Sequence, residues 1–140
     1  MKIELACDID TDAIYKIECE SFLHPWSKDA ILGEINGKAS GVYIAKSGDD
    51  VVGYIAIRTV CDEDEITRIA VKNSRRRQGI AERLIASTLK GNVCYLDVRA
   101  DNTPAISLYK KLGFVQNGER QKYYSDGKDA LLFVRSKEKI

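Results

Sequence analysis

Three consecutive arginines, Arg75, Arg76 and Arg77, precede a predicted helix, and Gly79 follows them closely. The start of a helix is the end at which the helix dipole disfavours cations, by about 0.3–1 kcal/mol each. It is also where backbone N–H groups lack partners within the helix. Three cations, free N–H groups and a glycine that permits close approach suit a polyanion, so one interpretation is a phosphate site. The alternative is a solvated basic turn without a ligand.

Two other side chains have the chemistry of acids and bases. Asp97 interrupts an otherwise apolar run over residues 93–98, and an unpaired buried carboxylate is costly. It therefore either faces water at the end of a strand or is buried with a raised affinity for a proton, as a general base requires. Tyr109 falls on the predicted inward face of the next helix and brings a phenol to the same end of the sheet. Its alternative role is that of a core tyrosine with one hydrogen bond.

Alternating strands and helices are predicted to position these residues. The β-branched run 66–71 indicates a strand, and the helix after Gly79 carries apolar residues at helical spacing: Ile80, Ala81, Leu84, Ile85 and Leu89. The run 93–98 indicates a strand covered on both faces. Asn102 then caps a helix that ends at Gly113. This order predicts a right-handed parallel crossover, and ligands of such sheets favour the carboxyl ends of the parallel strands.

The flanking segments predict further elements. Strands are expected at residues 2–7, 42–46, 51–60, 114–124 and 130–134. A helix is expected after Asp10 or Thr11, and Ser27 is expected to cap a short helix that ends at Gly37. The acidic stretch 61–65 predicts a solvated turn or, alternatively, a negative patch that attracts a basic substrate. Residues 137–140 are expected to form a frayed tail.

The rarer residue types argue against a metal centre. The single histidine, His24, is expected to be exposed, so a site built on several histidines is excluded. The four cysteines, at positions 7, 19, 61 and 94, form no Cys-x-x-Cys pair and are expected to be small buried hydrophobes. The single tryptophan, Trp26, is expected to anchor the next helix in the core, with direct substrate contact as the alternative.

The composition is that of one ordinary globular domain, with 140 residues, 44% apolar residues and a formal net charge of +1. This near-neutral charge argues against a broad nucleic-acid or membrane-binding surface, and no aromatic platform accompanies the arginines. No apolar run approaches the roughly 20 residues of a membrane span, and the N-terminus lacks a signal-peptide pattern. A cytoplasmic location is therefore expected.

The turn after the 66–71 strand resembles a family signature. The acetyl-CoA motif of the GNAT acetyltransferase superfamily is Arg or Gln, two residues, Gly, one residue, then Gly or Ala, which matches Arg76-Arg77-Gln78-Gly79-Ile80-Ala81. The chain also resembles bacterial ribosomal-protein-alanine N-acetyltransferases (RimI type) over nearly its whole length. The matching pieces are Phe22 with Pro25-Trp26-Ser27, residues 96–102, Ala105-Ile106 with Leu108-Tyr109, Leu112-Gly113-Phe114, and Tyr123-Tyr124 with Asp129-Ala130.

This resemblance implies a fold, an activity and a co-substrate. The fold would be α/β, one N-acetyltransferase domain over residues 1–140, with a mixed central sheet of about six to seven strands and about four flanking helices. The activity would be transfer of an acetyl group from acetyl-CoA to a protein N-terminal amine, with the N-terminal alanine of a small-subunit ribosomal protein as substrate. No metal and no covalent enzyme intermediate would be needed.

The resemblance also implies the site residues. The backbone of Ile69, Ala70 and Val71 would bind the pantetheine arm, and Asn102 would contact the cofactor arm. The pyrophosphate would lie against Arg76, Arg77, Gln78, Gly79, Ile80, Ala81 and Glu82. Tyr109 would protonate the departing thiolate. The family's general base is a glutamate where this chain has Asp97, so a bridging water would be needed to reach the substrate amine.

Two other functions stay open. One is an acetyltransferase for a small amine or a lysine side chain. The other is a non-catalytic acetyl-CoA-binding sensor or partner subunit, because the usual glutamate is replaced at Asp97.

Overall fold

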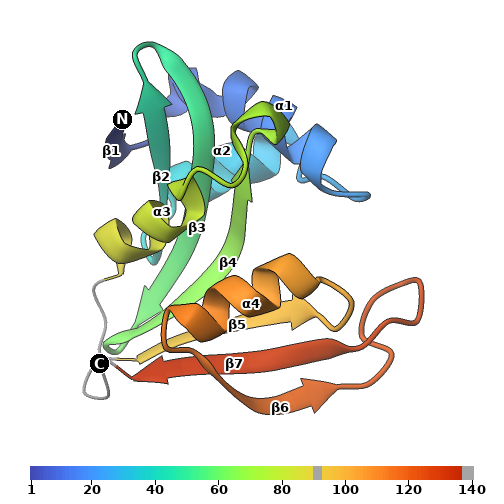
Figure 1. Ribbon diagram of the computed structural model, residues 1–140. Helices are drawn as coiled ribbons and strands as arrows, with labels where there is room; N and C mark the ends of the chain where they lie inside the picture. Colours follow the sequence, from blue (N-terminus) through green and yellow to red (C-terminus); the bar gives the residue numbers. More distant parts are fainter. Residues whose placement is uncertain (90–92, 137–140) are drawn as a thin grey trace. The chain divides into compact units, whose positions relative to one another are not determined.

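The computed structural model describes residues 1–89 and 93–136, in which seven strands form a mixed sheet of order β1-β2-β3-β4-β5-β7-β6 (Figure 1). The strands are β1 (Lys2–Leu5), β2 (Ser40–Ser47), β3 (Asp50–Val60), β4 (Glu63–Val71), β5 (Val93–Arg99), β6 (Val115–Arg120) and β7 (Ala130–Ser136). The α-helices are α1 (Thr11–Ser21), α2 (Lys28–Asn36), α3 (Ile80–Thr88) and α4 (Thr103–Lys111). Short 3-10 helices, η1 (Asp8–Asp10) and η2 (Asn73–Arg75), precede α1 and α3. The predicted fold class is confirmed.

The chain forms two compact units that share β4. The first comprises residues 1–58 and 67–89, and the second comprises residues 59–66 together with the described residues from 93 onward. The prediction of a single domain over residues 1–140 stays a prediction, and each unit is described by itself. Within the described residues, no helix is long and apolar enough to cross a membrane.

In the first unit, an antiparallel sheet is covered by helices. Buried apolar residues of α1, α2, β2 and β3 form one core, including Ile14, Ile31, Ile44 and Tyr54. At Gly53 on β3, a Cβ atom would lie only 3.2 Å from a side-chain carbon of Ile80. The missing side chain therefore lets α3 lie close to the strand.

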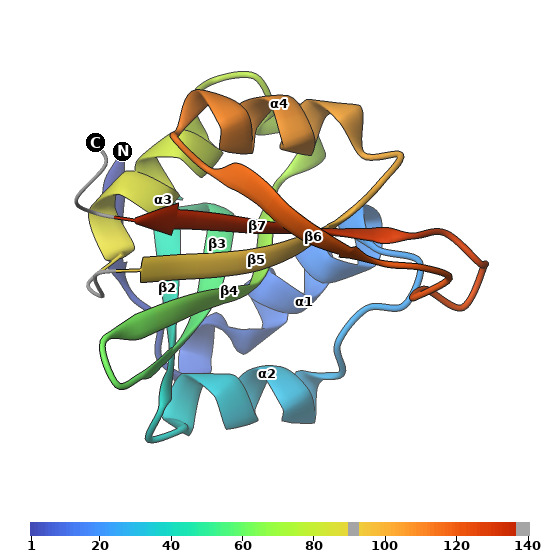
Figure 2. The same cartoon turned by 90° about the horizontal axis from the view of Figure 1, so that it is seen from below.

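In the second unit, the first half of β4 pairs in parallel with β5, from Glu63 opposite Val93 to Ile66 opposite Leu96. Strand β7 pairs antiparallel with both β5 and β6, and Figure 2 shows these three strands side by side. The buried residues of β5 alternate along the strand, and Tyr109 of α4 packs against Phe114 and Phe133 in the same core.

Three predictions about burial are wrong. First, β5 is not covered on both faces, because Tyr95 and Asp97 are exposed while Cys94, Leu96 and Val98 are buried. The run looked fully apolar because Tyr95 counts as an apolar residue. Tyr95 is nevertheless 38% exposed, so β5 has one buried face and one exposed face.

The second error concerns the acidic stretch 61–65, which is only partly a turn. Cys61 and Asp62 form the turn with positive φ angles of 51° and 65°, and Glu63 already begins β4. Asp64 is 1% exposed and accepts a hydrogen bond from the Thr59 hydroxyl at 2.6 Å. Because strand pairing with β5 reaches back to Glu63, the four acids do not form one solvated cluster.

The third error concerns the cysteines. Cys94 is buried, but Cys7, Cys19 and Cys61 are exposed. A small thiol side chain is compatible with either environment, so residue type alone did not decide its burial. The predicted tail at residues 137–140 lies outside the described residues.

Candidate functional site

The turn between β4 and α3 has the backbone shape of an anion site. Arg77 and Gly79 adopt left-handed conformations, with φ angles of 63° and 76°. Gly79 is the N-cap of α3, and no side chain caps this helix start. Among the described residues, no backbone acceptor pairs with the N–H groups of Gly79, Ile80 or Ala81, and the first helical bond runs from Arg83 N to Gly79 O. Such a run of unpaired N–H groups beside left-handed residues forms a nest for anions.

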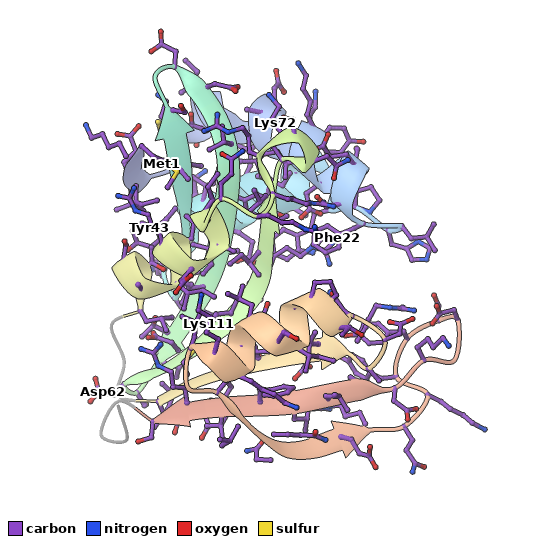
Figure 3. All side chains as sticks on the ribbon, in the orientation of Figure 1. Met1, Phe22, Tyr43, Asp62, Lys72 and Lys111 are labelled. Atoms are coloured by element: carbon purple, nitrogen blue, oxygen red, sulfur yellow. The ribbon has the colours of Figure 1, made fainter. Side chains whose placement is uncertain are left out.

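Two of the three arginines hold this turn in place with their side chains. Arg76 Nε donates to the carbonyl of Val71 at 3.2 Å, and its Nη2 donates to Ser21 Oγ at 3.4 Å. Arg75 Nε donates to Gln78 Oε1 at 3.0 Å. Lys72, labelled in Figure 3, joins the start of the turn to β3 through a 2.8 Å bond from its N–H to Val52 O. The basic run therefore shapes the nest as well as supplying positive charge.

The end of β4 supplies a strand edge. Pairing between β4 and β5 ends at Ile66, so this ladder does not extend to Ile69, Ala70 or Val71. Ala70 and Val71 are buried and Ile69 is half-buried. An unpaired strand edge accepts an extended ligand through main-chain hydrogen bonds.

In the second unit, Asp97 faces water, which is the first of the two alternatives predicted from the sequence. Its side chain lies on the exposed face of β5, opposite Leu132 of β7 in the register. No described residue pairs with its carboxylate. The carboxylate is therefore open to water and able to contact a ligand through it.

Tyr109 is buried in the second unit, with 6% of its surface exposed. Burial raises the pKa of Tyr109 to about 12, with smaller contributions from Cys94 and Tyr124. Its ring centroid lies 5.7 Å from that of Phe114 in an edge-to-face contact. The phenol thus stays protonated at neutral pH.

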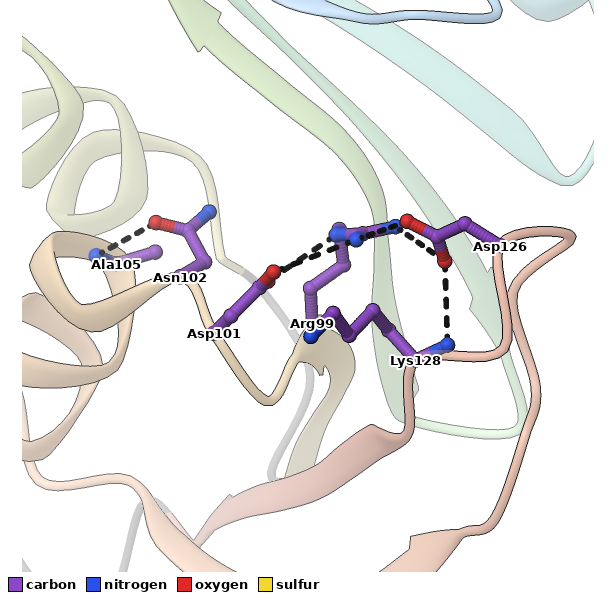
Figure 4. Close-up of polar contacts among 6 residues, drawn as sticks. All are labelled: Arg99, Asp101, Asn102, Ala105, Asp126 and Lys128. Carbon is purple, nitrogen blue, oxygen red and sulfur yellow. Dashed lines mark hydrogen bonds and ion pairs between the residues drawn. The ribbon is translucent and has the colours of Figure 1, made fainter.

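Asn102 has a structural role that the sequence also predicted. It is the N-cap of α4, and its Oδ1 accepts from Ala105 N at 3.3 Å (Figure 4). The carbonyl oxygen of the side chain therefore caps the helix, and the amide NH2 group is the donor end of the side chain.

Two arginine clusters escaped the sequence analysis. In the second unit, Arg99 bonds Asp101 at 3.2 Å and Asp126 at 2.6 Å (Figure 4). The guanidinium carbon of Arg99 also lies 4.9 Å from the centroid of the Tyr124 ring. Hydrogen bonds from Arg99 hold the pKa of both carboxyl groups below the usual range. These contacts tie the loop between β6 and β7 to the end of β5.

The other cluster lies in the first unit, where Arg68 of β4 pairs with the buried carboxylate of Glu18. A sequence signal existed for it. Arg68 interrupts an apolar strand, as Asp97 does, and Glu18 follows Ile14 and Ile17 on the buried face of α1. Trp26 is partly buried and packs against the core of the first unit, as predicted, and its alternative role in direct substrate contact stays a prediction.

Among the described residues, no group of three or more His, Cys, Asp or Glu side chains is arranged to hold a metal ion.

Comparison with known proteins identifies the relatives of this chain. Residues 11–114 match the Acetyltransferase (GNAT) family. A Bacillus subtilis protein named as a candidate [ribosomal protein bS18]-alanine N-acetyltransferase is 39% identical over 132 residues, covering 88% of this chain and 87% of its own length. The N-alpha-acetyltransferase RimI of Mycobacterium tuberculosis is 34% identical over 136 residues, covering 90% of this chain and 86% of its own.

A solved structure agrees with these matches. The crystal structure of the ribosomal-protein-S18-alanine N-acetyltransferase from Escherichia coli superposes with a TM-score of 0.88 at 27% identity, covering 96% of this chain and 92% of that one. The match of residues 11–114 spans the anion nest, β4, Asp97 and Tyr109. This chain therefore belongs to the GNAT family of acetyltransferases.

Proposed function

We propose that this protein transfers an acetyl group from acetyl-CoA to a protein N-terminal amine, and that its acceptor is the N-terminal alanine of a small-subunit ribosomal protein. The observation that carries this proposal is the nest at Arg77 and Gly79, at the start of α3. A diphosphate fits a nest of this kind because its oxygens accept several N–H bonds at once. The acceptor class is supported by relatives named for acetylation of the alanine of ribosomal protein bS18.

Residues of the first unit would hold the coenzyme. The N–H groups from Arg77 to Glu82 would bind the pyrophosphate, with Arg76 and Gln78 keeping the turn in shape. The backbone of Ile69, Ala70 and Val71 would pair with the pantetheine arm as an added strand does. Asn102 would contact the same arm through its side-chain amide. When bound, the coenzyme supplies an activated acetyl thioester.

Asp97 would accept the proton of the acceptor amine through a water molecule. A protein α-amine has a pKa of about 7.7–8.0, so only one readily lost proton must be removed. The exposure of Asp97 on β5 allows water beside its carboxylate. The side chain of Asp97 is one methylene shorter than that of glutamate, and the bridging water would span the resulting gap to the amine.

Tyr109 would return a proton at the other end of the reaction. Tyr109 would donate its phenolic proton to the sulfur while the amine nitrogen forms its bond to the thioester carbonyl carbon and the carbon–sulfur bond breaks. Because the amine attacks directly, none of the cysteines acts as a nucleophile.

A panel of acceptors tests the function. Peptides with different N-terminal residues, the same peptides blocked at the N-terminus but containing lysine, free amino acids and polyamines are incubated with acetyl-CoA and analysed by mass spectrometry. We expect acetylation at the α-amine of peptides that begin with alanine, and none on the blocked peptides. Acetylation of polyamines or lysine alone would show that the acceptor is a small amine or a lysine side chain. Tight acetyl-CoA binding without any transfer would indicate a sensor.

A further inference from the structure

A buried carboxylate and a half-buried guanidinium meet where β4 passes the loop after α1. Glu18 is 0% exposed and accepts bonds from Arg68 Nη2 at 2.9 Å and Nε at 3.0 Å. The same carboxylate accepts from the backbone N–H of Trp26 at 2.7 Å. One acidic side chain thus binds both the strand and the far end of the loop.

Arg68 adds contacts along the rest of this loop, residues 22–26. Its Nη2 donates to the carbonyl of His24 at 3.0 Å. Its guanidinium carbon lies 3.8 Å from the centroid of the Phe22 ring and 5.1 Å from that of the Trp26 ring. Figure 3 labels Phe22, which begins the loop. Between these attachments, Leu23 is 84% exposed, so the loop is held on its inner side while its outer side meets solvent.

Stability alone does not account for this arrangement. Removing two charges from water costs several kcal/mol, and a well-packed apolar pair in the same place is often as stable or more stable. The ion pair also restricts orientation, because the planar guanidinium of Arg68 forks onto a carboxylate and lies over the rings of Phe22 and Trp26. The pair therefore specifies the position of the loop more than it stabilises the fold.

The position of Arg68 along β4 relates the loop to the reaction. The nest lies after Val71, and the strand edge proposed for the pantetheine arm runs back from Val71 to Ile69. An arm that begins at the nest and follows this edge ends beside Arg68, the next residue along the strand. The loop that Arg68 holds is therefore attached to β4 at the level where the acetyl group would arrive and where an acceptor must approach.

We propose that Arg68 is a positioning residue for the acceptor: through Glu18, Phe22 and Trp26 it holds the 22–26 loop in the conformation that receives the incoming peptide. This inference rests on the proposed function. Arg68 itself takes no part in proton transfer, and its effect on the reaction passes through the loop.

The test replaces the ion pair by an apolar pair, in the double variant Glu18→Met/Arg68→Met, so that no charge is left buried without a partner. We expect the KM for an alanine-starting peptide to rise by about 10-fold or more, since small displacements of positioning groups are costly. The KM for acetyl-CoA should stay near the wild-type value. Arg58→Met is the matched control, because Arg58 is exposed and its ion pair with Glu34 is long at 3.9 Å.

Trp26 gives a readout that does not depend on activity. It is the single tryptophan of the chain, so quenching of intrinsic fluorescence by acrylamide reports the loop directly. Quenching should increase in the double variant and not in Arg58→Met. Thermal unfolding by circular dichroism should show that both variants are folded. The single variant Arg68→Lys keeps the charge without the fork, and it should share the rise in peptide KM.

The outcomes separate the two proposals. Unchanged quenching would show that Arg68 does not hold the loop, and increased quenching with an unchanged peptide KM would show that the loop does not position the acceptor. Either result overturns this inference and leaves the proposed function standing. A wild-type protein that acetylates no peptide would overturn both.

Discussion

The environment of Asp97 was left open by the sequence and is decided by the structure. An aspartate in an apolar run suggested either a buried base or a carboxylate facing water, and the alternation of burial along β5 decided for water. A carboxylate on an exposed strand face is available to a ligand without the cost of burying it first. Its proposed role as a base therefore depends on its access to water and to the acceptor.

Replacing Asp97 tests this role through pH. Asp97→Ala should lose most activity at low pH, where the amine of the acceptor is protonated and needs a base. At a pH well above the amine pKa of about 7.7–8.0, the loss should shrink because the amine is already neutral. The measurement is kcat/KM for the alanine-starting peptide against pH. Asp97→Glu, which supplies the family's residue, is the control and should keep the parent profile. An Asp97→Ala profile parallel to the parent profile would show that water or another group, and not Asp97, accepts the proton of the amine.

Tyr109 leads to a second prediction at this scale. Tyr109→Phe should slow turnover by roughly 10²–10⁴-fold if the phenol is the acid, while acetyl-CoA binding measured by calorimetry stays near normal. Unchanged turnover would show that Tyr109 is not the general acid.

The alkaline unfolding of the same variant checks the environment of the phenol independently. The pKa of Tyr109 in the folded protein, about 12, lies above the ordinary tyrosine value of 10.0. The stabilisation from the neutral phenol is therefore complete below pH 10 and is lost as pH rises towards 12. Tyr109→Phe should lack that component of alkaline destabilisation in urea titrations.

At the scale of elements, the junction of β4, η2 and α3 determines how the chain would bind phosphate. Arg77 adopts a positive φ although it has a side chain, a conformation that is uncommon outside glycine, asparagine and aspartate. Arg75 and Arg76 hold the turn through hydrogen bonds to Gln78 and Val71. The left-handed residues direct successive N–H groups to one side, which a regular helix start does only partly.

Gly79→Ala tests this junction. The Cβ atom would meet nothing within 4 Å, but φ at this residue is +76°, so the cost is backbone strain of about 1–2 kcal/mol. Relief of the strain by rotation would turn the N–H groups away from the pyrophosphate, and we expect the Kd for acetyl-CoA to rise by about 10-fold or more. Calorimetric titration measures it.

The chain contains a matched control for this change. Gly48, between β2 and β3, has a φ of +62° and equally open space around it. Gly48→Ala should cost similar stability without altering acetyl-CoA binding. Equal effects of the two variants on binding would mean that the turn at Gly79 is not the phosphate site.

At the scale of the whole molecule, the residues of the proposed site belong to two compact units. The nest and the 69–71 strand edge lie in the first unit, whereas Asp97, Asn102 and Tyr109 lie in the second. Strand β4 runs through both, pairing with β5 up to Ile66 and continuing to Val71. One strand thus carries the parallel pairing of the second unit and the proposed cofactor edge of the first.

The sequence by itself determined the features that depend on near neighbours. Ser27 and Asn102 cap their helices as predicted, and each side-chain oxygen accepts an N–H three residues ahead. Gly79 stands at the left-handed start of α3, and β2 and β3 lie where strands were predicted at residues 42–46 and 51–60. Local residue types suffice for such features because caps and turns are closed within a few residues of chain.

Only the tertiary structure decided the features that depend on distant parts of the chain. Glu18 and Arg68 are separated by 50 positions, and their contact requires α1 to pack beside β4. The exposure of Asp97, Cys7 and Cys19 likewise depends on which faces the neighbouring elements cover. Burial and ion pairing are properties of the packed chain, and residue type and spacing along the sequence leave them undetermined.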